Sequence, residues 1–247
     1  MAPKTILNYS PNFNSKKRIS KKIKYIIFHY TGMKSEVRAI SRLTKIQSEV
    51  SCHYLIKKNG DIVKIVPDLY IAWHAGQSSW KNDVSLNHNS IGIEITNPGH
   101  EFGYKKFAKK QIASLLKLSK FLIKKYKINS KNILGHSDIA PSRKKDPGEK
   151  FPWKLLSNSK IGFWHALDKI ELIKNRKLKT SQIDKKTFFN NLFKIGYSKK
   201  IPKTSNENRY LKDVTKAFQR RFRQELVDGK IDRESLLIST NLSKKFN

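Results

Sequence analysis

Apolar residues follow two different periods over the first two thirds of the chain, and the order of these periods predicts the fold. Apolar runs of strand length lie at residues 24–29, 53–56, 62–66, 91–96 and 133–134. Apolar residues recur at helical spacing over 36–48 and 106–127. Strand and helix signals that alternate in this way favour an α/β fold, with a mixed central β-sheet flanked by helices.

Three of these runs carry more detailed signals. Asn59–Gly60 stands between the runs 53–56 and 62–66 and is a strong signal for a β-hairpin. In the run 91–96, strand alternation places the isoleucines on one face and Gly92 with Glu94 on the other. A lone carboxylate in so apolar a strand is costly to bury unless it is paired, hydrogen-bonded or near a metal. The alternative is an exposed face of an edge strand.

The pattern changes after Trp153, and the chain divides into four predicted parts. Residues 157–180 are rich in lysine and are interpreted as a linker or an extension packed on the main domain. Further helical segments at 186–193 and 211–222 predict a small all-α C-terminal domain. The predicted parts are an N-terminal extension (1–23), the main domain (24–156), the linker or extension (157–180) and the helical domain (181–247).

Composition limits the possible classes of protein. With 38% hydrophobic residues, the chain of 247 residues can bury a real core, which excludes wholesale disorder. The net charge of +33 predicts attraction to polyanions, although lysines spread along the whole chain are equally typical of a solvated basic surface. Nucleic acid is not expected as a partner, because neither zinc-finger spacing nor an aromatic base-stacking platform is present.

Membrane and redox signals are few. The single cysteine, Cys52, excludes an internal disulfide. No apolar run approaches the length of a transmembrane helix, so no transmembrane segment is expected. The first residues lack the apolar core of a secretory signal, which favours the cytoplasm unless a signal has been removed.

The loop at 135–153 carries the strongest chemical signal. It contains His136, Lys144 and Asp146 among prolines and glycines that make a continuous helix improbable. A third candidate ligand, His29, ends the first buried strand. Two imidazoles and one carboxylate suit Zn²⁺ with an open position, a site that activates water for hydrolysis of an amide. His53 and His74 are rival ligands, whereas His88, His100 and His165 are expected at the surface.

Five segments resemble the zinc-dependent N-acetylmuramoyl-L-alanine amidases of the type 2 family, which are related to peptidoglycan recognition proteins. They are IIFHYTG (26–32), SCHYLIKKNGDI (51–62), AWHAGQSSW (72–80), NHNSIGIEITNPG (87–99) and GHSDIAPSRKKDPGEKFPW (135–153). The resemblance makes 24–156 a catalytic domain that binds one Zn²⁺. It implies cleavage of the amide between N-acetylmuramic acid, or its anhydro form, and L-alanine, in cell-wall turnover, remodelling or recycling.

The resemblance also assigns roles to individual residues. It makes His29, His136 and Asp146 the zinc ligands, Glu94 the catalytic carboxylate and Lys144 the group that stabilises the oxyanion. Residues in motif segments that line the groove of relatives are candidates for substrate contact: Tyr30, His53, Trp73, His74 and Asn87. For each of these the alternative is a structural role, such as core packing for Trp73.

The C-terminal part resembles a three-helix peptidoglycan-binding domain, through FKIGY (193–197) and KAFQRRFRQELVDGKIDRESL (216–236). The expected partners are therefore peptidoglycan or muropeptides, and we expect a monomer. A wall-binding domain favours the cell envelope or periplasm, with the cytoplasm as the alternative. A non-catalytic peptidoglycan-binding protein is the second function considered, and it would not need Glu94.

Overall fold

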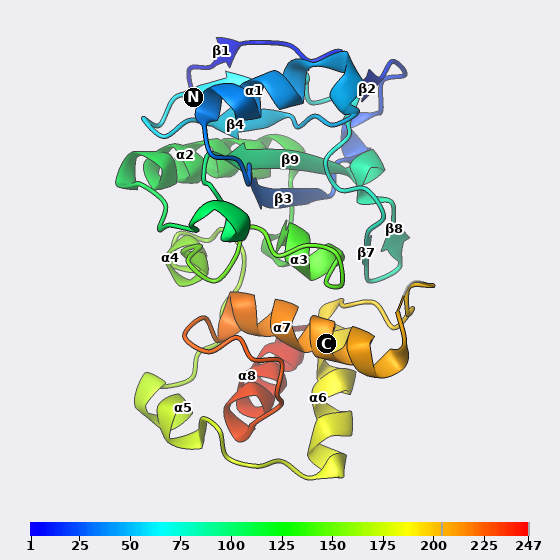
Figure 1. The fold of residues 1–247 in the computed structure, drawn as a ribbon, viewed down its shortest axis with the longest axis vertical. Coiled ribbons are helices and arrows are strands. Elements are labelled where there is room, and N and C mark those ends of the chain that lie inside the picture. The colour runs from blue at the N-terminus through cyan, green and yellow to red at the C-terminus, as the bar shows by residue number, and fades with distance from the viewer. Residues whose placement is uncertain (204, 247) are drawn as a thin grey trace.

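A six-stranded mixed sheet forms the centre of the larger part of the molecule (Figure 1). The computed structural model describes residues 1–203 and 205–246. The strands are β1 (Ile6–Leu7), β3 (Tyr25–Tyr30), β4 (Tyr54–Ile56), β5 (Ile62–Lys64), β9 (Ser90–Ile95) and β10 (Ile133–Gly135), in the order β1-β5-β4-β9-β3-β10. Strands β4, β9, β3 and β10 are parallel, whereas β5 runs antiparallel to β4. The predicted mixed sheet is confirmed, and so is the hairpin.

Two helices cover opposite faces of this sheet. Helix α2 (Lys109–Tyr126) packs through Leu115, Leu118 and Leu122 against the isoleucines of β9. Helix α1 (Glu36–Thr44) packs on the other face, where its Leu43 joins Leu55 of β4 in a separate cluster. Both helices were predicted, although α1 ends earlier than the helical spacing suggested. Helix α2 ends at Tyr126, and the next residue, Lys127, adopts the left-handed conformation.

Short elements complete this part and include residues of the N-terminal extension. Strand β1 pairs with β5 at the sheet edge, and β2 (Phe13–Asn14) pairs with β6 (Ile71–Ala72). A second small ribbon joins β7 (Ser79–Trp80) to β8 (Asp83–Val84). In the described residues, 3₁₀ turns lie at Ser20–Lys22, Ile46–Ser48, Leu86–Asn89, His100–Phe102, Ser130–Asn132 and Lys244–Phe246.

The remaining helices follow β10. They are α3 (His136–Ile139), α4 (Trp153–Asn158), α5 (Lys169–Asn175), α6 (Gln182–Ile195), α7 (Glu207–Phe222) and α8 (Arg233–Ser243). The predicted segments 186–193 and 211–222 lie within α6 and α7. Helix α5 lies inside the segment interpreted as a linker or extension, and apolar periodicity had not indicated α8.

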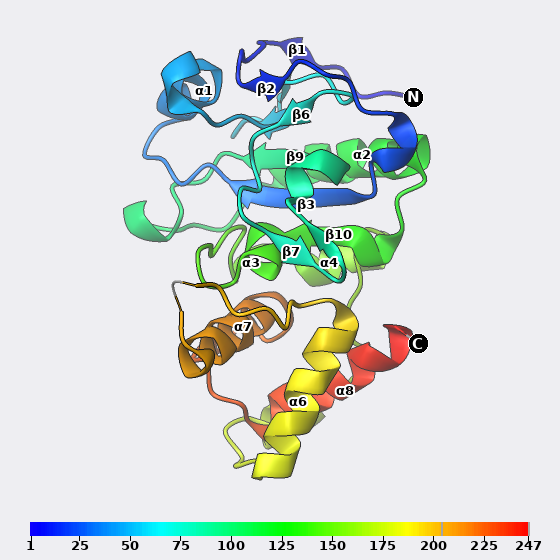
Figure 2. The same cartoon turned by 90° about the vertical axis from the view of Figure 1, so that its right-hand side faces the viewer.

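The C-terminal helices share a core with the sheet. One cluster joins Ile27 of β3 and Leu134 of β10 to Phe188, Phe218 and residues of α8. In Figures 1 and 2, α6, α7 and α8 lie below the sheet on the side of α3. These helices therefore cover the part of β3 and β10 that faces away from α2.

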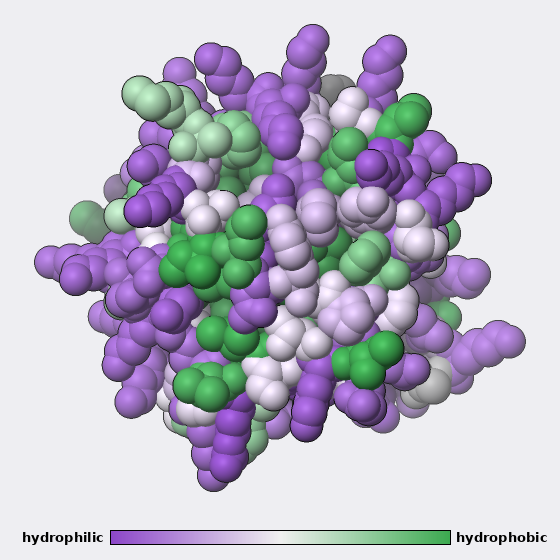
Figure 3. Space-filling model, turned by 90° about the horizontal axis from the view of Figure 1, so that it is seen from above, coloured by the Kyte–Doolittle hydropathy of each residue, from purple (hydrophilic) through white to green (hydrophobic). Residues whose placement is uncertain are grey.

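The surface is strongly polar on the face above β1 and α1. Figure 3 shows long hydrophilic side chains projecting around this face, with apolar patches between them. Among the described residues, no helix combines the length and apolar character needed to cross a membrane.

Candidate functional site

Strands β3 and β9 place two site residues side by side. They are adjacent and parallel, and their register aligns His29 with Glu94. Side chains alternate along a strand, so both residues face away from α2, on the same side as Ile27 and Gly92. The isoleucines of β9 pack toward α2, as the alternation predicted.

The segment after β10 supplies two more site residues, His136 and Asp146. Strand β10 pairs with β3 on the side away from β9, and His136 opens helix α3 directly after it. The backbone then folds back so that Ser137 N donates to the carbonyl of Asp146 over 2.8 Å. Asp138 holds the start of this turn, because its Oδ2 accepts from Gly135 N over 2.8 Å.

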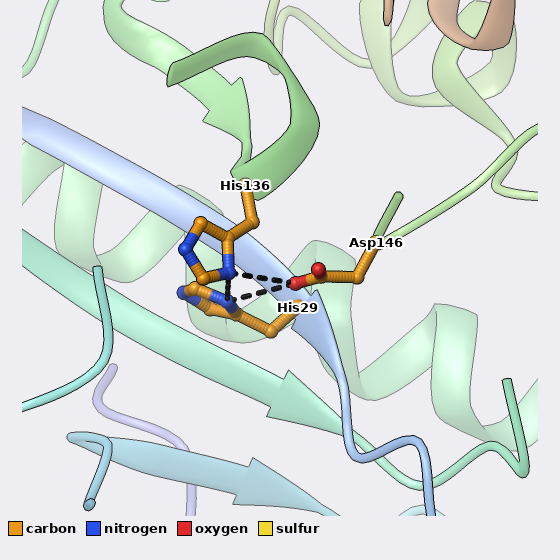
Figure 4. A group of neighbouring side chains, drawn as sticks. All are labelled: His29, His136 and Asp146. Carbon is orange, nitrogen blue, oxygen red and sulfur yellow. Dashed lines mark hydrogen bonds and ion pairs between the residues drawn. The ribbon is translucent and has the colours of Figure 1, made fainter. Parts of the chain in front are cut away.

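Three side chains converge in this place, and we call them the His–His–Asp cluster (Figure 4). The Nδ1 atoms of His29 and His136 lie 2.9 Å apart, and each lies 3.0 Å from Asp146 Oδ2. All three residues are buried. Sequence reasoning placed these three residues together, and the structure brings them together.

The hydrogen bonding of His136 shows that the cluster fits a cation. Its Nε2 lies 3.1 Å from the carbonyl of Ala75, which can only accept, so in the neutral ring Nε2 carries the hydrogen. Its Nδ1 therefore presents a lone pair to the Asp146 carboxylate. His136 Nδ1 and the Asp146 carboxylate are then both acceptors at hydrogen-bond distance with no hydrogen between them. They repel each other unless a positive charge lies between them. The donor set of two imidazoles and one carboxylate is one that Zn²⁺ binds.

Burial and mutual contacts set the protonation of the cluster. Burial and the neighbouring His136 lower the pKa of His29 to about 4, so its ring is neutral at pH 7. Burial alone would raise the pKa of Asp146, but the close contacts with His136 and His29 outweigh it and hold that pKa far below its usual range. Neutral imidazoles and an ionised carboxylate are the forms that bind metals.

Glu94 lies in the wall of the same cavity. Burial, and then the charge of Asp146, raise its pKa to about 8, while Lys144 acts in the opposite direction. Its Oε2 is buried and has no hydrogen-bond partner among the described residues. This strand carboxylate is therefore held beside the cluster in an unsatisfied state.

The cavity is a groove of about 450 Å³ above the cluster. Its wall includes the basic side chains Arg42, Arg143, Lys144 and Lys145. Of the residues predicted to contact substrate, Tyr30, Trp73 and His74 line it. The groove can therefore hold a ligand against the cluster, Glu94 and a positively charged rim.

Two residues with the same predicted role lie outside the groove lining. His53 is fully buried, and its Nδ1 accepts from Gly92 N over 3.0 Å while its Nε2 lies 3.1 Å from Tyr70 O. Asn87 Oδ1 accepts from the backbone of His74 and Ala75, over 3.1 and 2.7 Å. Both make hydrogen bonds within the protein, and their contact with substrate stays a prediction.

His100 lines the groove, although the sequence placed it among surface histidines. Its Nδ1 lies 2.8 Å from Tyr30 Oη, and its Nε2 lies 3.0 Å from Glu149. The turn at Gly99, with φ of +70°, brings it back over β3. No local spacing signals such a contact, because Tyr30 and His100 are far apart in the chain.

Comparison with known proteins gives one consistent result. The family model described as N-acetylmuramoyl-L-alanine amidase matches residues 19–149. The chain is 35% identical over 237 residues to the N-acetylmuramoyl-L-alanine amidase AmiD of Escherichia coli, covering 91% of this chain and 84% of AmiD. It is 39% identical over 114 residues to the 1,6-anhydro-N-acetylmuramyl-L-alanine amidase AmpD of Haemophilus influenzae, covering 46% of this chain and 60% of AmpD.

Solved structures agree with these relatives. A complex of E. coli AmiD with anhydro-N-acetylmuramic acid-L-Ala-D-γ-Glu-L-Lys has a TM-score of 0.78 and 33% identity, and covers 91% of this chain and 90% of that one. AmpDh3 from Pseudomonas aeruginosa has a TM-score of 0.78 and 31% identity, and covers 95% of this chain and 96% of that one. Both similarities extend across the part that contains the sheet and the C-terminal helices.

Proposed function

Because the chain belongs to the N-acetylmuramoyl-L-alanine amidase family, we propose that the groove above the His–His–Asp cluster is its active site. The enzyme hydrolyses the amide between N-acetylmuramic acid and L-alanine of peptidoglycan. The observation that carries the proposal is the convergence of three metal-binding atoms beside the unsatisfied carboxyl group of Glu94.

The cofactor in this proposal is one Zn²⁺. His29 and His136 would hold it through Nδ1, and Asp146 through its carboxylate. Bound zinc supplies a Lewis acid that polarises a carbonyl and lowers the pKa of water.

Glu94 is the proposed catalytic base. It takes a proton from water as the water oxygen bonds to the lactyl carbonyl carbon. The carbon–nitrogen bond then breaks, and the proton passes to the nitrogen of L-alanine, which leaves as an amine. A carboxyl group with a pKa of about 8 and a free oxygen can both accept and release this proton near neutral pH.

Lys144 is the proposed stabiliser of the negative charge that develops on the carbonyl oxygen. It lines the groove and acts electrostatically on both His29 and Glu94. Among the proposed substrate contacts, Trp73 presents an aromatic face suited to a sugar ring, and its Nε1 is held by Asn14 Oδ1 at 2.6 Å.

The proposed partners are peptidoglycan or released muropeptides. Solved relatives that cover the catalytic part and the helices contain an anhydro-muramyl peptide, in AmiD and in AmpDh3. We assign residues 181–247 to peptidoglycan binding, which would raise the local concentration of substrate at the active site. For the compartment we propose the cell envelope, with the cytoplasm as the alternative, and for the oligomeric state a monomer. Cell fractionation and light scattering test these two assignments.

The role of Glu94 is tested by the isosteric variant Glu94→Gln. Turnover of purified muropeptides should fall by at least about 10²-fold, since a general base contributes 10²–10⁴-fold. Zinc content should be unchanged, because Glu94 is not one of the proposed ligands. Glu171→Gln, an exposed change on α5, is the matched control. Near-normal turnover in Glu94→Gln would remove Glu94 from the mechanism.

The zinc requirement is tested on the unmodified enzyme. Mass spectrometry should detect stem peptides that begin with L-alanine, and this release should stop with a chelator and return on addition of zinc. If fragments bind to the zinc-loaded protein and stay intact, the chain is a binding protein and the catalytic assignments fail.

A further inference from the structure

The Nε2 atoms of both histidines in the cluster point away from Asp146 and form hydrogen bonds to one short segment, His74–Ala75. His29 Nε2 contacts His74 Nδ1, and His136 Nε2 contacts Ala75 O. We propose that His74 and Ser90 are positioning residues that fix the tautomer of His29, so that its Nδ1 lone pair faces the metal position. The proposal rests on the proposed function, since it concerns the same cluster. It gives His74 a role through His29 in addition to the predicted contact with substrate.

The direction of these hydrogen bonds follows from the contact between Ser90 and the carbonyl of Leu86. Ser90 Oγ donates to the carbonyl of Leu86 over 2.5 Å, and a carbonyl can only accept. The single hydrogen of this hydroxyl is therefore used, and its oxygen is left to accept from His74 Nε2, 3.2 Å away.

The proton on His74 then determines the proton on His29. A neutral His74 that donates from Nε2 has a bare Nδ1, which lies 3.1 Å from His29 Nε2. His29 must donate to it, so its hydrogen sits on Nε2 and its Nδ1 presents a lone pair to Asp146 and His136. Outer hydrogen bonds of this kind orient metal-ligating histidines in general.

The same segment acts on the second histidine. Ala75 O accepts from His136 Nε2 over 3.1 Å, and Arg143 Nη2 also donates to it over 2.9 Å. Asn87 anchors the backbone of the segment through its two hydrogen bonds. One segment thus directs both Nδ1 atoms toward Asp146.

Close packing restricts the hydrogen-bonded series His29–His74–Ser90, which we call the relay. Ser90 has no exposed surface. The His74 ring lies so close to Gly92 that a β-carbon there would approach it to 2.4 Å. Without the Ser90 hydroxyl, His74 can carry its hydrogen on Nδ1 and donate to His29, which moves the His29 hydrogen to Nδ1, where it blocks metal binding.

The first experiment measures zinc affinity by competition with a chelator. Ser90→Ala should weaken zinc binding by about 10- to 100-fold, as loss of an outer-shell partner does. Ser90→Thr, which keeps the hydroxyl, should restore affinity. The matched control is Ser119→Ala on α2, since Ser119 is equally buried and its hydroxyl has no partner among the described residues. It should bind zinc like the wild type.

A second pair of variants decides the matter if Ser90→Ala does not fold. His74→Leu removes the acceptor that faces His29, whereas His74→Asn keeps an amide oxygen that can accept the same hydrogen bond. Zinc should bind more tightly to His74→Asn than to His74→Leu. Equal affinity in the two variants would contradict the relay.

The third measurement reads the protons directly. Long-range ¹H–¹⁵N NMR of the metal-free wild type should show a hydrogen on Nε2 of His29. A bare Nε2 on His29, or wild-type zinc affinity in folded Ser90→Ala, overturns the proposal. Failure of the wild type to bind zinc at all would instead overturn the proposed function.

Discussion

Gly92 shows how little free space surrounds the site at the scale of single residues. It faces the cluster side of β9, and an added β-carbon would meet the His74 ring at 2.4 to 2.7 Å. The backbone conformation does not require glycine at this position, since Gly92 does not have a positive φ. The glycine is needed because the His74 ring approaches the strand closely.

Gly92→Ala should therefore lower the free energy of unfolding by about 1–3 kcal/mol, the usual range for overpacking. It should also weaken zinc binding, because the ring that contacts His29 is displaced. Urea unfolding and chelator competition measure the two effects.

The control for this prediction is a double-mutant cycle. In a His74→Ala background the added methyl group has no ring to meet, so Gly92→Ala should cost less stability there. Equal losses in both backgrounds would mean that the contact with His74 is not the cause.

Residue identity predicted the cluster well, and the reason is chemical. Histidine and aspartate have side-chain atoms that bind metals. His29 lies near the end of a buried strand, and His136 and Asp146 lie in a stiff loop, and both positions are visible in the sequence. His100 and Ser90 could not be predicted in the same way. A serine and a surface-like histidine have many ordinary uses, and only the fold brings them to Tyr30 and His74.

At the scale of elements, Asp68 joins the C-terminal end of α2 to β4. Its carboxylate accepts from Tyr54 Oη over 2.5 Å, from Tyr126 Oη over 2.6 Å and from Lys125 Nζ over 2.9 Å. Burial alone would raise the pKa of Asp68, but these hydrogen bonds outweigh it and depress the pKa well below the usual range. The ionised form therefore stabilises the packing of α2 on the sheet.

Asp68→Asn should lower the free energy of unfolding by about 2 kcal/mol at pH 7, since hydrogen bonds to charged groups contribute about 1.5–3 kcal/mol each. A depressed folded pKa means that the contribution is present above about pH 4 and is lost as the pH falls below it. The difference between wild type and variant, measured by urea unfolding, should therefore shrink in acid. A constant difference from pH 7 to pH 3 would contradict this assignment.

The periodicity of the sequence predicted the longer elements and the three-residue strands β4, β5 and β10, but it missed the shortest strands and helix α8. The parallel strands β3 and β9 and helix α2 have strong apolar patterns, because each buries a full face. Strands β1, β2, β6, β7 and β8 have two residues each, too few for a period to be visible. Helix α8 was missed because it buries serines along with Ile238 and Leu242, so its buried side is not apolar throughout.

At the scale of the whole molecule, a buried ion pair ties the C-terminal helices to the loop that carries His136. Arg221 of α7 donates from Nη1 to Asp138 Oδ2 over 2.5 Å and from Nη2 to Ile133 O over 3.0 Å. Tyr197 Oη donates to the other oxygen of Asp138 over 2.9 Å. Asp138 lies two residues after His136, so this contact supports the turn that presents a proposed ligand.

Arg221→Met should lower the free energy of unfolding by about 3–5 kcal/mol, because it leaves the Asp138 carboxylate buried without its cation. Adding Asp138→Asn should recover part of the loss by removing that charge. Chemical denaturation of the two single variants and the double variant measures the coupling. Independent, additive losses would show that the pair does not join the two parts.

The shared core predicts a single unfolding transition for the whole chain. The four tryptophans all lie between residues 73 and 164, so their fluorescence reports the larger part of the molecule and its contacts with the C-terminal helices, such as that of Trp80 with Tyr197. Far-UV circular dichroism also reports α6, α7 and α8. The two signals should change together in urea. Separate midpoints would indicate that the helices unfold on their own.

The same core has a consequence for synthesis on the ribosome. Ile27, Leu134 and Ile139 are made long before Leu242, which belongs to the same cluster. About 100 residues separate Ile139 from Leu242, which takes roughly 5 to 20 s at ordinary elongation rates. During that time the nascent sheet has an uncovered apolar face beside the His–His–Asp cluster. Chaperones that bind apolar surfaces should therefore engage this chain until α8 has emerged.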